Sequence, residues 1–385
     1  MNKLGIYIHI PFCKRKCNYC DFYSCTDIQL IKEYIDALCT HIEKESKLYK
    51  DYEIDTIFFG GGTPSLVEPN EFEALMDIIK RNYRISPSCE FSLEANPATL
   101  SEEKLLCYKK NGVNRLSIGL QSTFDDELKM LGRIHTYSEF LDNFKLAREC
   151  GFENISVDVM YSLPEQKREQ LLKTLERVCG LSPEHISSYC LKIEEKTPFG
   201  KIKDKLALPS EDEEYYMYIS MCEMLEKNGY SQYEISNFSK SGYESKHNLK
   251  YWQSLDYVGF GPAAHSYIDG KRYYYKDDTK LYIEQVKNGS LPEKILDKND
   301  ENVHVSARIS KEDEYVMLKM RLSAGMNIKE FFDRFDKDFL STYPRVEKYV
   351  KSGHIALRDG AYCFTYKGFF VSNYILTDIL NFNDE

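Results

Sequence analysis

The sequence predicts an α/β fold in which six parallel strands alternate with helices, followed by a smaller, mainly helical C-terminal domain. From residue 3 to about residue 191, short apolar runs alternate with longer amphipathic segments, and the pattern changes after that point. Strands and helices repeated in this order build a parallel sheet with right-handed crossovers. A doubly wound sheet and a partial (β/α)6 barrel both fit six repeats, and both place functional groups at the carboxyl ends of the strands.

Six short segments have the strand signature, because they are rich in Ile, Val, Phe and Tyr and most are followed by Gly, Pro or Asn. They span residues 4–10, 56–59, 90–95, 115–120, 156–160 and 185–191. Helical patterns lie between them. In the first of these, Ile31, Tyr34 and Leu38 fall on one face at spacings of three and four residues. The others lie near residues 71–82, 102–110, 138–149 and 167–178.

The chain after residue 191 follows a different pattern. Helical segments near 211–228 and 310–322 flank a stretch rich in Tyr and Gly at 229–275. The tail then has two or three helices and a candidate hairpin, 353–355 with 361–364. We therefore expect three domains: a barrel core at 1–200, an extension at 201–300, and a helical domain at 301–385 for which a winged-helix arrangement is one option.

Composition and charge are ordinary for a soluble globular protein, with 42% hydrophobic and 29% charged residues in a chain of 385. The chain has no run of about 18 apolar residues that would span a bilayer. Residues 1–10 form a strand pattern and lack the features of a signal peptide. We therefore expect a cytoplasmic protein without a transmembrane segment. The net charge of -10 argues against nucleic acid as a partner.

Three of the 12 cysteines stand apart from the rest. Cys13, Cys17 and Cys20 form a C-x3-C-x2-C motif directly after the first strand, so all three thiols can reach one metal site. The three basic residues between Cys13 and Cys17 are expected to lower the thiol pKa values. A structural zinc site is the alternative, but zinc normally takes four ligands in two separated pairs, and no second pair follows in the sequence. Cys25 is the only near candidate for a fourth ligand.

Polar residues also follow the later strands, as expected if the carboxyl ends of the strands form one functional face. A Gly-Gly-Gly-Thr segment at 60–63 comes after the second strand, Glu94 lies near the end of the third, Gln121 follows the fourth, and Asp158 lies near the end of the fifth. Glycine lets backbone N–H groups approach an anionic ligand closely, and the helix start that follows is expected to add a favourable dipole. A tight turn at the glycines and a surface charge at Glu94 are the structural alternatives.

The cysteine motif after a first strand resembles the signature of the radical S-adenosylmethionine (SAM) superfamily. The resemblance implies a partial (β/α)6 barrel in which Cys13, Cys17 and Cys20 bind a [4Fe–4S] cluster. The fourth iron would be left open for the amino and carboxylate groups of SAM. The resemblance also implies a set of SAM contacts, matched by position in this chain: Tyr7, Tyr19, Gly61, Gly62, Thr63, Glu94, Gln121, Arg133 and Asp158.

A closer resemblance, to the anaerobic coproporphyrinogen III oxidase family, extends over essentially the whole chain. The segments that resemble the pattern of this family are, in order, 7–13, 60–65, 115–122, 131–136 and 157–160. Ser162 departs from that pattern, because the family usually has Gly at this position and serine tolerates a positive φ poorly. The departure concerns only the conformation of one loop.

Two functions compete within that family. The oxidase removes two propionate carboxyl groups from a porphyrinogen, and it usually has a further Cys where this chain has Phe22. The heme chaperone subfamily (HemW) is similar to this chain in the Cys-Asp-Phe sequence at 20–22 and in the H-N-x-x-Y-W motif at 247–252. The sequence favours the chaperone, with an oxygen-independent coproporphyrinogen III oxidase as the alternative.

The chaperone resemblance implies heme as cargo and a heme-accepting protein as partner, with an electron donor as a further partner if the cluster is redox active. Imidazole is a usual axial ligand of heme iron, which makes His247 a candidate heme ligand, and Trp252 could flank the porphyrin face. A hydrogen-bonded structural histidine is the alternative for His247. For His265, packing in a turn is favoured.

Overall fold

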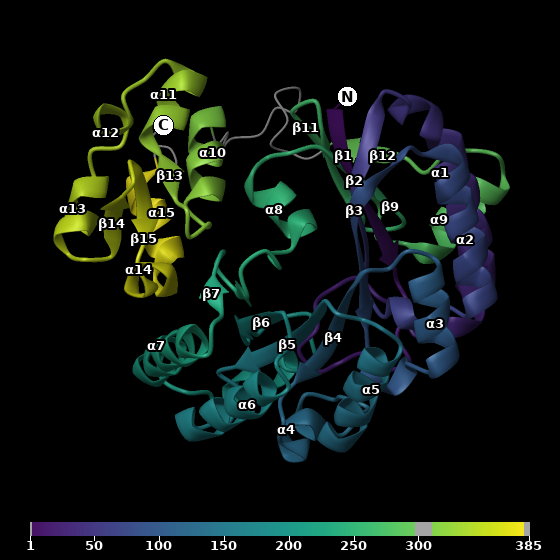
Figure 1. Cartoon of the computed structure of the whole chain (residues 1–385), viewed down its shortest axis with the longest axis horizontal. Coiled ribbons are helices and arrows are strands. Elements are labelled where there is room, and N and C mark those ends of the chain that lie inside the picture. Colours follow the sequence, from purple (N-terminus) through teal and green to yellow (C-terminus); the bar gives the residue numbers. More distant parts are fainter. Residues whose placement is uncertain (1, 297–309, 381–385) are drawn as a thin grey trace.

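The computed structural model describes residues 2–296 and 310–380, and its central feature is a curved parallel sheet (Figure 1). The sheet contains the six predicted strands as β1 (Asn2–Ile10), β2 (Tyr52–Gly61), β3 (Ile85–Ala95), β4 (Arg115–Gln121), β5 (Ile155–Tyr161) and β6 (His185–Cys190). They pair side by side in chain order, and all of them run parallel. A doubly wound sheet reverses its strand order partway across, whereas this order does not reverse. The partial barrel is therefore the correct alternative.

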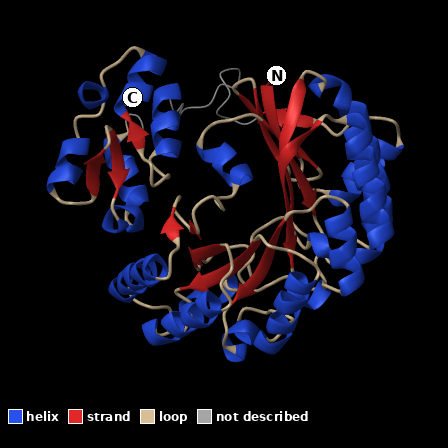
Figure 2. Cartoon of the chain, viewed as in Figure 1, coloured by secondary structure: helices blue, strands red, loops and turns tan. Residues whose placement is uncertain are grey.

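The helices that follow these strands cover the outer face of the sheet (Figure 2). They are α1 (Ile31–Glu45), α2 (Pro69–Asn82), α3 (Glu102–Lys110), α4 (Asp125–Met130), α5 (Tyr137–Glu149) and α6 (Arg168–Gly180). In β1, the fully buried Leu4, Ile6 and Ile8 alternate with Tyr7 and His9. Because the apolar face of each strand packs under the helices in one continuous core, the opposite face is left for the interior of the barrel.

The stretch rich in Tyr and Gly extends the sheet at both edges. The added strands are, beside β1, β9 (Tyr257–Phe260), β10 (His265–Ile268), β11 (Lys271–Tyr275) and β12 (Lys294–Leu296), and beside β6, β8 (Asn237–Ser239) and β7 (Ser231–Gln232). Helices α7 (Glu211–Lys227) and α9 (Thr279–Lys287) pack against α6 and α1. Strands this short show no clear alternation of polar and apolar residues, which explains why the sequence did not predict them.

A short helix, α8 (Lys246–Trp252), lies on the inner side of the curved sheet (Figure 1). Glu90 of β3 accepts hydrogen bonds from the backbone N–H groups of the first two residues of α8, at 3.0 and 3.1 Å. Lys250 of α8 forms an ion pair of 2.8 Å with Asp55 of β2. The helix therefore fills the interior near the amino ends of the strands and leaves their carboxyl ends for a cavity.

The C-terminal domain is mainly helical, as predicted, and it contains a small antiparallel sheet of β13 (Met326–Asn327), β15 (Ala361–Phe364) and β14 (Ile355–Arg358). The predicted hairpin is formed by β14 and β15. Asp359 and Gly360 join these strands with φ values of 48° and 76°, as a two-residue hairpin turn requires. This sheet and its helices fit the winged-helix option. The helices are α10 (Lys311–Lys319), α11 (Ile328–Phe335), α12 (Phe339–Thr342), α13 (Val346–Lys351), α14 (Tyr366–Phe370) and α15 (Ser372–Ile379).

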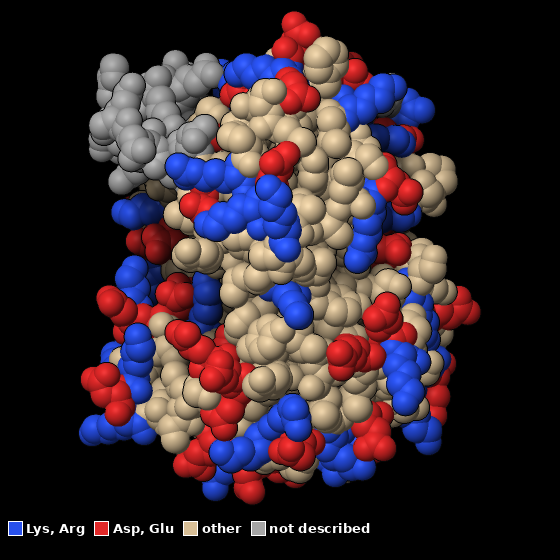
Figure 3. Space-filling model, turned by 90° about the vertical axis from the view of Figure 1, so that its left-hand side faces the viewer, with Lys and Arg blue, Asp and Glu red and all other residues tan. Residues whose placement is uncertain are grey.

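The C-terminal domain contacts the extension of the barrel directly. Ser323 donates a hydrogen bond to the carbonyl of Gln232, and Tyr366 donates one of 3.1 Å to Glu226 of α7. The predicted domain boundary between residues 300 and 301 lies outside the described residues. On the face shown in Figure 3, acidic and basic side chains of the described residues are interspersed. In the described ranges, no helix is long and apolar enough to cross a bilayer.

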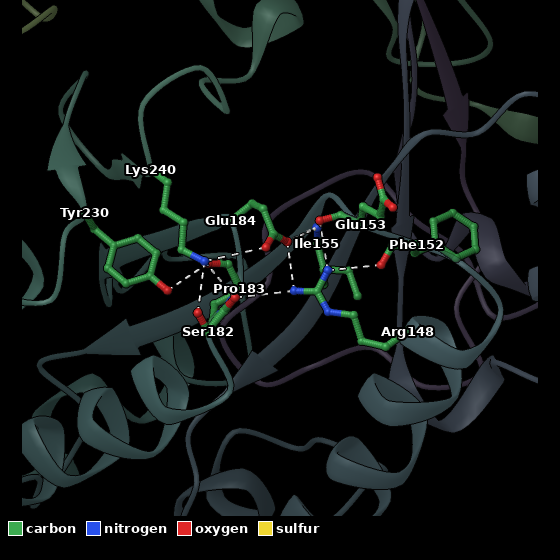
Figure 4. A network of polar contacts seen from close by, with 9 residues as sticks. All are labelled: Arg148, Phe152, Glu153, Ile155, Ser182, Pro183, Glu184, Tyr230 and Lys240. Atoms are coloured by element: carbon green, nitrogen blue, oxygen red, sulfur yellow. Dashed lines mark hydrogen bonds and ion pairs between the residues drawn. The ribbon is translucent and has the colours of Figure 1, made fainter.

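One carboxylate holds three segments together at the amino ends of β5 and β6 (Figure 4). Glu184 forms ion pairs with Arg148 of α5 at 2.8 Å and with Lys240 at 3.6 Å, and it accepts a hydrogen bond of 3.1 Å from the backbone N–H of Ile155. The two cations reach the carboxylate from opposite sides (Figure 4). Only 12% of the Glu184 side chain is exposed, so solvent screens these ion pairs less than it screens pairs on the surface.

We predict that Glu184→Gln lowers the free energy of unfolding by about 1.5–3 kcal/mol, because two cations lose their charged acceptor. Glu176→Gln is the matched control. Glu176 also pairs with a lysine, Lys173, at 2.7 Å, but the two side chains are 62% and 51% exposed, and such pairs contribute little to stability. Urea unfolding followed by circular dichroism measures both variants. Equal losses of stability in the two would contradict the prediction.

Candidate functional site

A cavity of about 340 Å³ opens at the carboxyl ends of the barrel strands. Every residue of the predicted cluster and SAM set except Tyr7 lines it. Tyr7 lies behind Phe58, with the two ring centroids 6.2 Å apart. The topology therefore brings residues from five strands and their loops to one place. The predicted residues that line the cavity are Cys13, Cys17, Tyr19, Cys20, Gly61, Gly62, Thr63, Glu94, Gln121, Arg133 and Asp158.

The three thiols of the motif belong to the loop that follows β1. The backbone N–H of Asn18 donates to the carbonyl of Leu131, after α4, at 2.9 Å, and that of Cys13 donates to the carbonyl of Cys25 at 2.9 Å. These bonds fix the loop from two sides. Cys25 is not among the residues that line the cavity, and it packs against the main hydrophobic core. The backbone of Cys25 thus lies beside Cys13, but Cys25 does not line the cavity that the three thiols of the motif share.

The electrostatics of the thiols differ from the expectation based on the sequence. Lys14, Arg15 and Lys16 are exposed, and burial outweighs their effect. Burial raises the pKa of the Cys13 thiol, and it raises the pKa of Cys20 to about 11. For Cys13 and Cys20 the expectation was wrong, because these thiols are partly enclosed and burial outweighs the effect of the exposed basic side chains. A thiolate in this position is stabilised by a cation that binds it directly, as a metal centre does.

The three thiols are not arranged as a site for one metal ion. Within residues 2–296 and 310–380, no group of three or more His, Cys, Asp or Glu side chains is placed to hold one metal ion. In an iron–sulfur cubane, each cysteine binds a different iron, so the thiols are more widely spaced than around one ion. Three thiols that line one cavity are compatible with such a cluster.

The glycine segment after β2 lies against the cysteine loop. Gly61 has a φ of +109°, and a Cβ on Gly62 would come within 2.7 Å of the carbonyl oxygen of Phe12. Neither position therefore accepts a side chain without strain. The next residue, Thr63, donates a hydrogen bond of 3.6 Å from its hydroxyl to the sulfur of Cys13. Glycine is needed here so that the end of β2 and the cysteine loop can approach each other.

The backbone N–H groups of these glycines do not form the anion-binding site that the sequence predicted. The N–H of Gly61 donates to Glu94 at 3.2 Å, and that of Gly62 donates to the carbonyl of Ile10 at 2.8 Å. The chain then makes a single 3-10 turn, Pro64–Leu66, and α2 begins only at Pro69. The expected helix dipole therefore does not act on this segment. The backbone N–H groups of Gly61 and Gly62 are bonded to residues distant in sequence, so the local pattern could not predict their partners.

Two half-buried carboxyl groups face the cavity. Burial, and after it the charge of Asp158, raises the pKa of Glu94 to about 8, and burial raises the pKa of Asp158 to about 6. Asp158 accepts a hydrogen bond of 3.1 Å from the hydroxyl of Ser117. Because a carboxylate offers about four acceptor sites, both groups can still accept hydrogen bonds from the hydroxyl groups of a ligand.

Arg133 and Gln121 form the wall of the cavity near Cys17. Arg133 donates to the carbonyl of Gly119 at 2.7 Å and to the sulfur of Cys17 at 3.6 Å, while its buried Nε has no partner among the described residues. Gln121 has a φ of 78°, which is uncommon for a residue other than glycine. Its side-chain oxygen accepts a hydrogen bond of 2.8 Å from Tyr189. An unpaired buried donor and a strained backbone in one wall are typical of a ligand site.

The position of His247 opposes the hypothesis that this residue binds heme iron. Its side chain is fully buried. Both ring nitrogens are bonded, Nδ1 to the hydroxyl of Thr56 at 2.7 Å and Nε2 to that of Tyr251 at 2.9 Å. Burial lowers the pKa of His247 to about 3, so the ring remains neutral. His247 therefore connects α8 to β2, which is the structural role that the sequence left open as an alternative.

Phe22, Trp252 and His265 were also considered in predicting the function. Of these three, Phe22 lines the cavity. Phe22 lies at the rim of the cavity, and 70% of its surface is exposed. Trp252 is half-buried at the end of α8, with the guanidinium of Arg321 at 5.9 Å from its ring centroid. His265 is exposed, and its ring stacks on that of Tyr274 at 5.1 Å between centroids. An apolar ring thus stands at the entrance to the cavity.

Several residues that line the cavity were not predicted. Arg115 could have been found, because it alternates along β4 with Ser117, Gly119 and Gln121 and so shares their inward face. The residues from the extension could not, since no local pattern places a short strand or α8 against the barrel interior. The main unpredicted residues are Arg115, Ser117, Ser187, Tyr189, Ser236, Asn237 and Asn248.

Comparison with known proteins identifies relatives of the whole chain. Residues 7–178 match the model of the radical SAM superfamily, and residues 312–371 match that of the HemN C-terminal domain. The heme chaperone HemW of Bacillus subtilis (strain 168) is 38% identical over 372 residues, which cover 95% of this chain and 96% of that protein. The heme chaperone HemW of Escherichia coli (strain K12) is 38% identical over 271 residues, which cover 69% of this chain and 70% of that protein.

Among solved structures, coproporphyrinogen III oxidase (HemN) from Escherichia coli, described as a radical SAM enzyme, has a similar fold. The TM-score is 0.83 at 21% sequence identity, and the match covers 99% of this chain and 91% of that one. At this level of identity the likeness establishes the fold alone. It supports the partial barrel with a helical C-terminal domain.

The raised pKa of Glu94 predicts how stability depends on pH in the ligand-free protein. Folding raises this pKa from 4.5 to about 8, so the folded state binds the proton more tightly than the unfolded state. The free energy of unfolding must then fall as pH rises from about 4.5 to about 8, by at most about 1.4 kcal/mol per pH unit. Glu94→Gln should remove this decline, most clearly between pH 6 and pH 8, because the pKa of Asp158 is about 6. Urea unfolding at a series of pH values is the measurement, and parallel curves for both proteins would contradict the prediction.

Proposed function

The chain belongs to the heme chaperone HemW family within the radical SAM superfamily, and on this premise we propose that it binds heme and transfers it to an acceptor protein. The observation that carries the proposal is the similarity, over 95% of the chain, to a relative named as a heme chaperone. This similarity includes the extension and the C-terminal domain, so it exceeds the part shared with the superfamily at large.

In this proposal, Cys13, Cys17 and Cys20 hold the [4Fe–4S] cluster that membership of the superfamily implies, and the fourth iron is left for SAM. The three thiols line one cavity, and Cys25 is not among its lining residues. A thiol that binds metal does so as the thiolate. Ligation to iron therefore removes the conflict between burial and ionisation that raises the pKa of Cys20 to about 11. The residues present fit a cluster held by three cysteines.

The other walls of the cavity fit SAM. We assign the ribose hydroxyls to Glu94 and Asp158, and the carboxylate to Gln121 and to Arg133, whose Nε has no partner among the described residues. Hydrogen bonds from hydroxyl groups favour the ionised form of a carboxyl group, so SAM binding should lower the pKa of Glu94. When bound, the cluster and SAM supply one-electron chemistry. The further contacts assigned to SAM are Tyr19, Gly61, Gly62 and Thr63, whereas Tyr7 lies behind Phe58 and is assigned a supporting role.

Heme is the cargo in this proposal, and the protein carries it without consuming it. His247 is not assigned as the iron ligand, because both of its ring nitrogens are bonded inside the barrel. The partners are heme, an acceptor protein and, if the cluster is redox active, an electron donor. We also assign the protein to the cytoplasm.

The alternative function is that of an oxygen-independent coproporphyrinogen III oxidase. The fold shared with that enzyme favours it. Two observations count against it. The first is that the relatives found over nearly the full length are named as heme chaperones. The second is that this chain has Phe22, at the rim of the cavity, in the position where the oxidase usually has Cys. An exposed phenylalanine cannot supply the thiol of that cysteine.

We predict that the protein with its cluster reconstituted binds heme but does not convert coproporphyrinogen III to protoporphyrinogen IX. Anaerobic titration with heme, followed at the Soret band, measures binding, and SAM-dependent turnover is measured on the same sample. His247→Ala should keep the Soret band, because the ring is bonded to Thr56 and Tyr251. It should also lower stability, because those two hydroxyl groups lose their partner.

SAM-dependent decarboxylation by the wild-type protein would overturn the chaperone proposal in favour of the oxidase. Loss of the Soret band in a His247→Ala protein that keeps its fold and its cluster would instead restore His247 as the heme ligand. The matched control is His354→Ala, since His354 is in the C-terminal domain and its ring contacts only its own domain, at Ser352 and Tyr349.

A further inference from the structure

The cavity has an inner end that the proposed cluster and SAM contacts leave unassigned. It is formed by the start of β4, by β6, and by residues of the extension that cross the inner side of the sheet. We call this part the inner subsite, and it comprises Arg115, Ser187, Ser236, Asn237 and Asn248, all of which line the cavity. Its composition is polar, and its one charged member is a cation.

Arg115 is buried without a counter-ion. Only 2% of the residue is exposed, and its Nε has no hydrogen-bond partner. Among the described residues, no ion pair includes this guanidinium. Glu94 and Asp158 are close enough to feel its charge, but neither forms an ion pair with Arg115, and they accept hydrogen bonds from Gly61, Ser117 and Ser187. A buried cation without a partner is costly, and such groups normally face a ligand or water.

The direction of the Arg115 side chain follows from the register of β4. Arg115, Ser117, Gly119 and Gln121 alternate with apolar residues that pack under the helices, so all four face the interior. Gln121 lies at the carboxyl end of the strand, and Arg115 lies at its amino end. The guanidinium therefore faces the cavity from the end opposite to the cluster motif.

The chemistry of the inner subsite selects a carboxylate. A guanidinium presents a planar fork of N–H donors that matches the two oxygens of a carboxylate, and the side-chain amide of Asn248 and the hydroxyl of Ser236 line the same space. Glu94 and Asp158 line the cavity as well. The charge of Asp158 would oppose a dianion such as phosphate more strongly than a group with a single charge.

We propose that Arg115 binds a carboxylate group at the inner end of this cavity. Two sources can supply it: a propionate arm of heme, in which case the inference rests on the proposed function, or a small free carboxylic acid. Arg115 then contributes to the choice of cargo, because a porphyrin without free acid groups could not engage it.

The first test compares heme with heme dimethyl ester, in which both propionates are esterified. The wild-type protein with its cluster should bind heme about tenfold or more tightly than the ester, because the ester cannot accept a charged hydrogen bond. In Arg115→Gln this preference should disappear, with similar affinities for both compounds. Arg115→Lys, which keeps the charge without the planar fork, should retain part of the preference and serves if the glutamine variant does not fold.

The second test detects a free carboxylate as the source. Sodium propionate, compared with sodium chloride at equal ionic strength, should raise the melting temperature of the wild-type protein and not that of Arg115→Gln. If propionate raises the melting temperature but the protein shows no preference for heme over its ester, the subsite binds a small acid. If the wild-type protein bound neither porphyrin, the heme proposal would fail, and the propionate titration would still decide the subsite. Absence of both effects would overturn the inference.

Stability provides an independent readout of the unpaired charge. Without ligand, Arg115→Gln should unfold at a higher temperature than the wild type, because a buried cation without a counter-ion is removed. The matched control, Arg148→Gln, should unfold at a lower temperature, since Arg148 pairs with Glu184 at 2.8 Å. A lower melting temperature for both variants would mean that Arg115 has a structural partner, and would contradict the inference.

Discussion

The alternation of side chains along β1 to β6 is the constraint on which the rest of the structure depends. Apolar side chains such as Leu4, Ile6 and Ile8 are fully buried under the outer helices, and this burial fixes the register of each parallel strand. Once the register is fixed, the alternate residues must face the interior, and the strands must end at one edge. The cysteine loop, the glycine segment and the carboxyl groups are brought together as a consequence, and so is Arg115 at the opposite end of β4.

The sequence predicted the six barrel strands and the outer helices α1, α2, α3, α5 and α6 because each has a sufficiently long pattern of apolar residues, but it did not predict the six-residue helix α4. It could not choose between a doubly wound sheet and a barrel, since that choice depends on which strands pair. In the extension, the sequence predicted the helix α7 (Glu211–Lys227) but indicated no strands in the stretch rich in Tyr and Gly. Its strands are two to five residues long, and α8 is held inside the barrel by Glu90 and Asp55, which are distant in sequence. The hairpin turn at Asp359 and Gly360 was predictable because the residues themselves favour it.

In the candidate site too, the local patterns were predictable and the tertiary environment was not. The residues matched to the cluster and to SAM lie at strand ends, and the structure places all but Tyr7 on one cavity wall. The electrostatics were not predictable: burial, a tertiary property, raises the pKa of Cys20 despite its basic neighbours. Likewise, a motif drew attention to His247, but only the fold shows both ring nitrogens to be bonded. Arg115 was overlooked because it begins a strand, whereas attention was given to the residues that end one.

The account depends most on a cluster held by three cysteines with one iron left open. The direct measurement is the iron and acid-labile sulfide content of anaerobically reconstituted protein in which Cys13, Cys17, Cys20 or Cys25 is replaced singly by Ser. We expect the first three variants to lose the cluster and Cys25→Ser to retain it, since Cys25 packs against the core outside the cavity. A Cys25→Ser protein that folds but holds no cluster would mean that the protein supplies all four ligands, and would contradict the account.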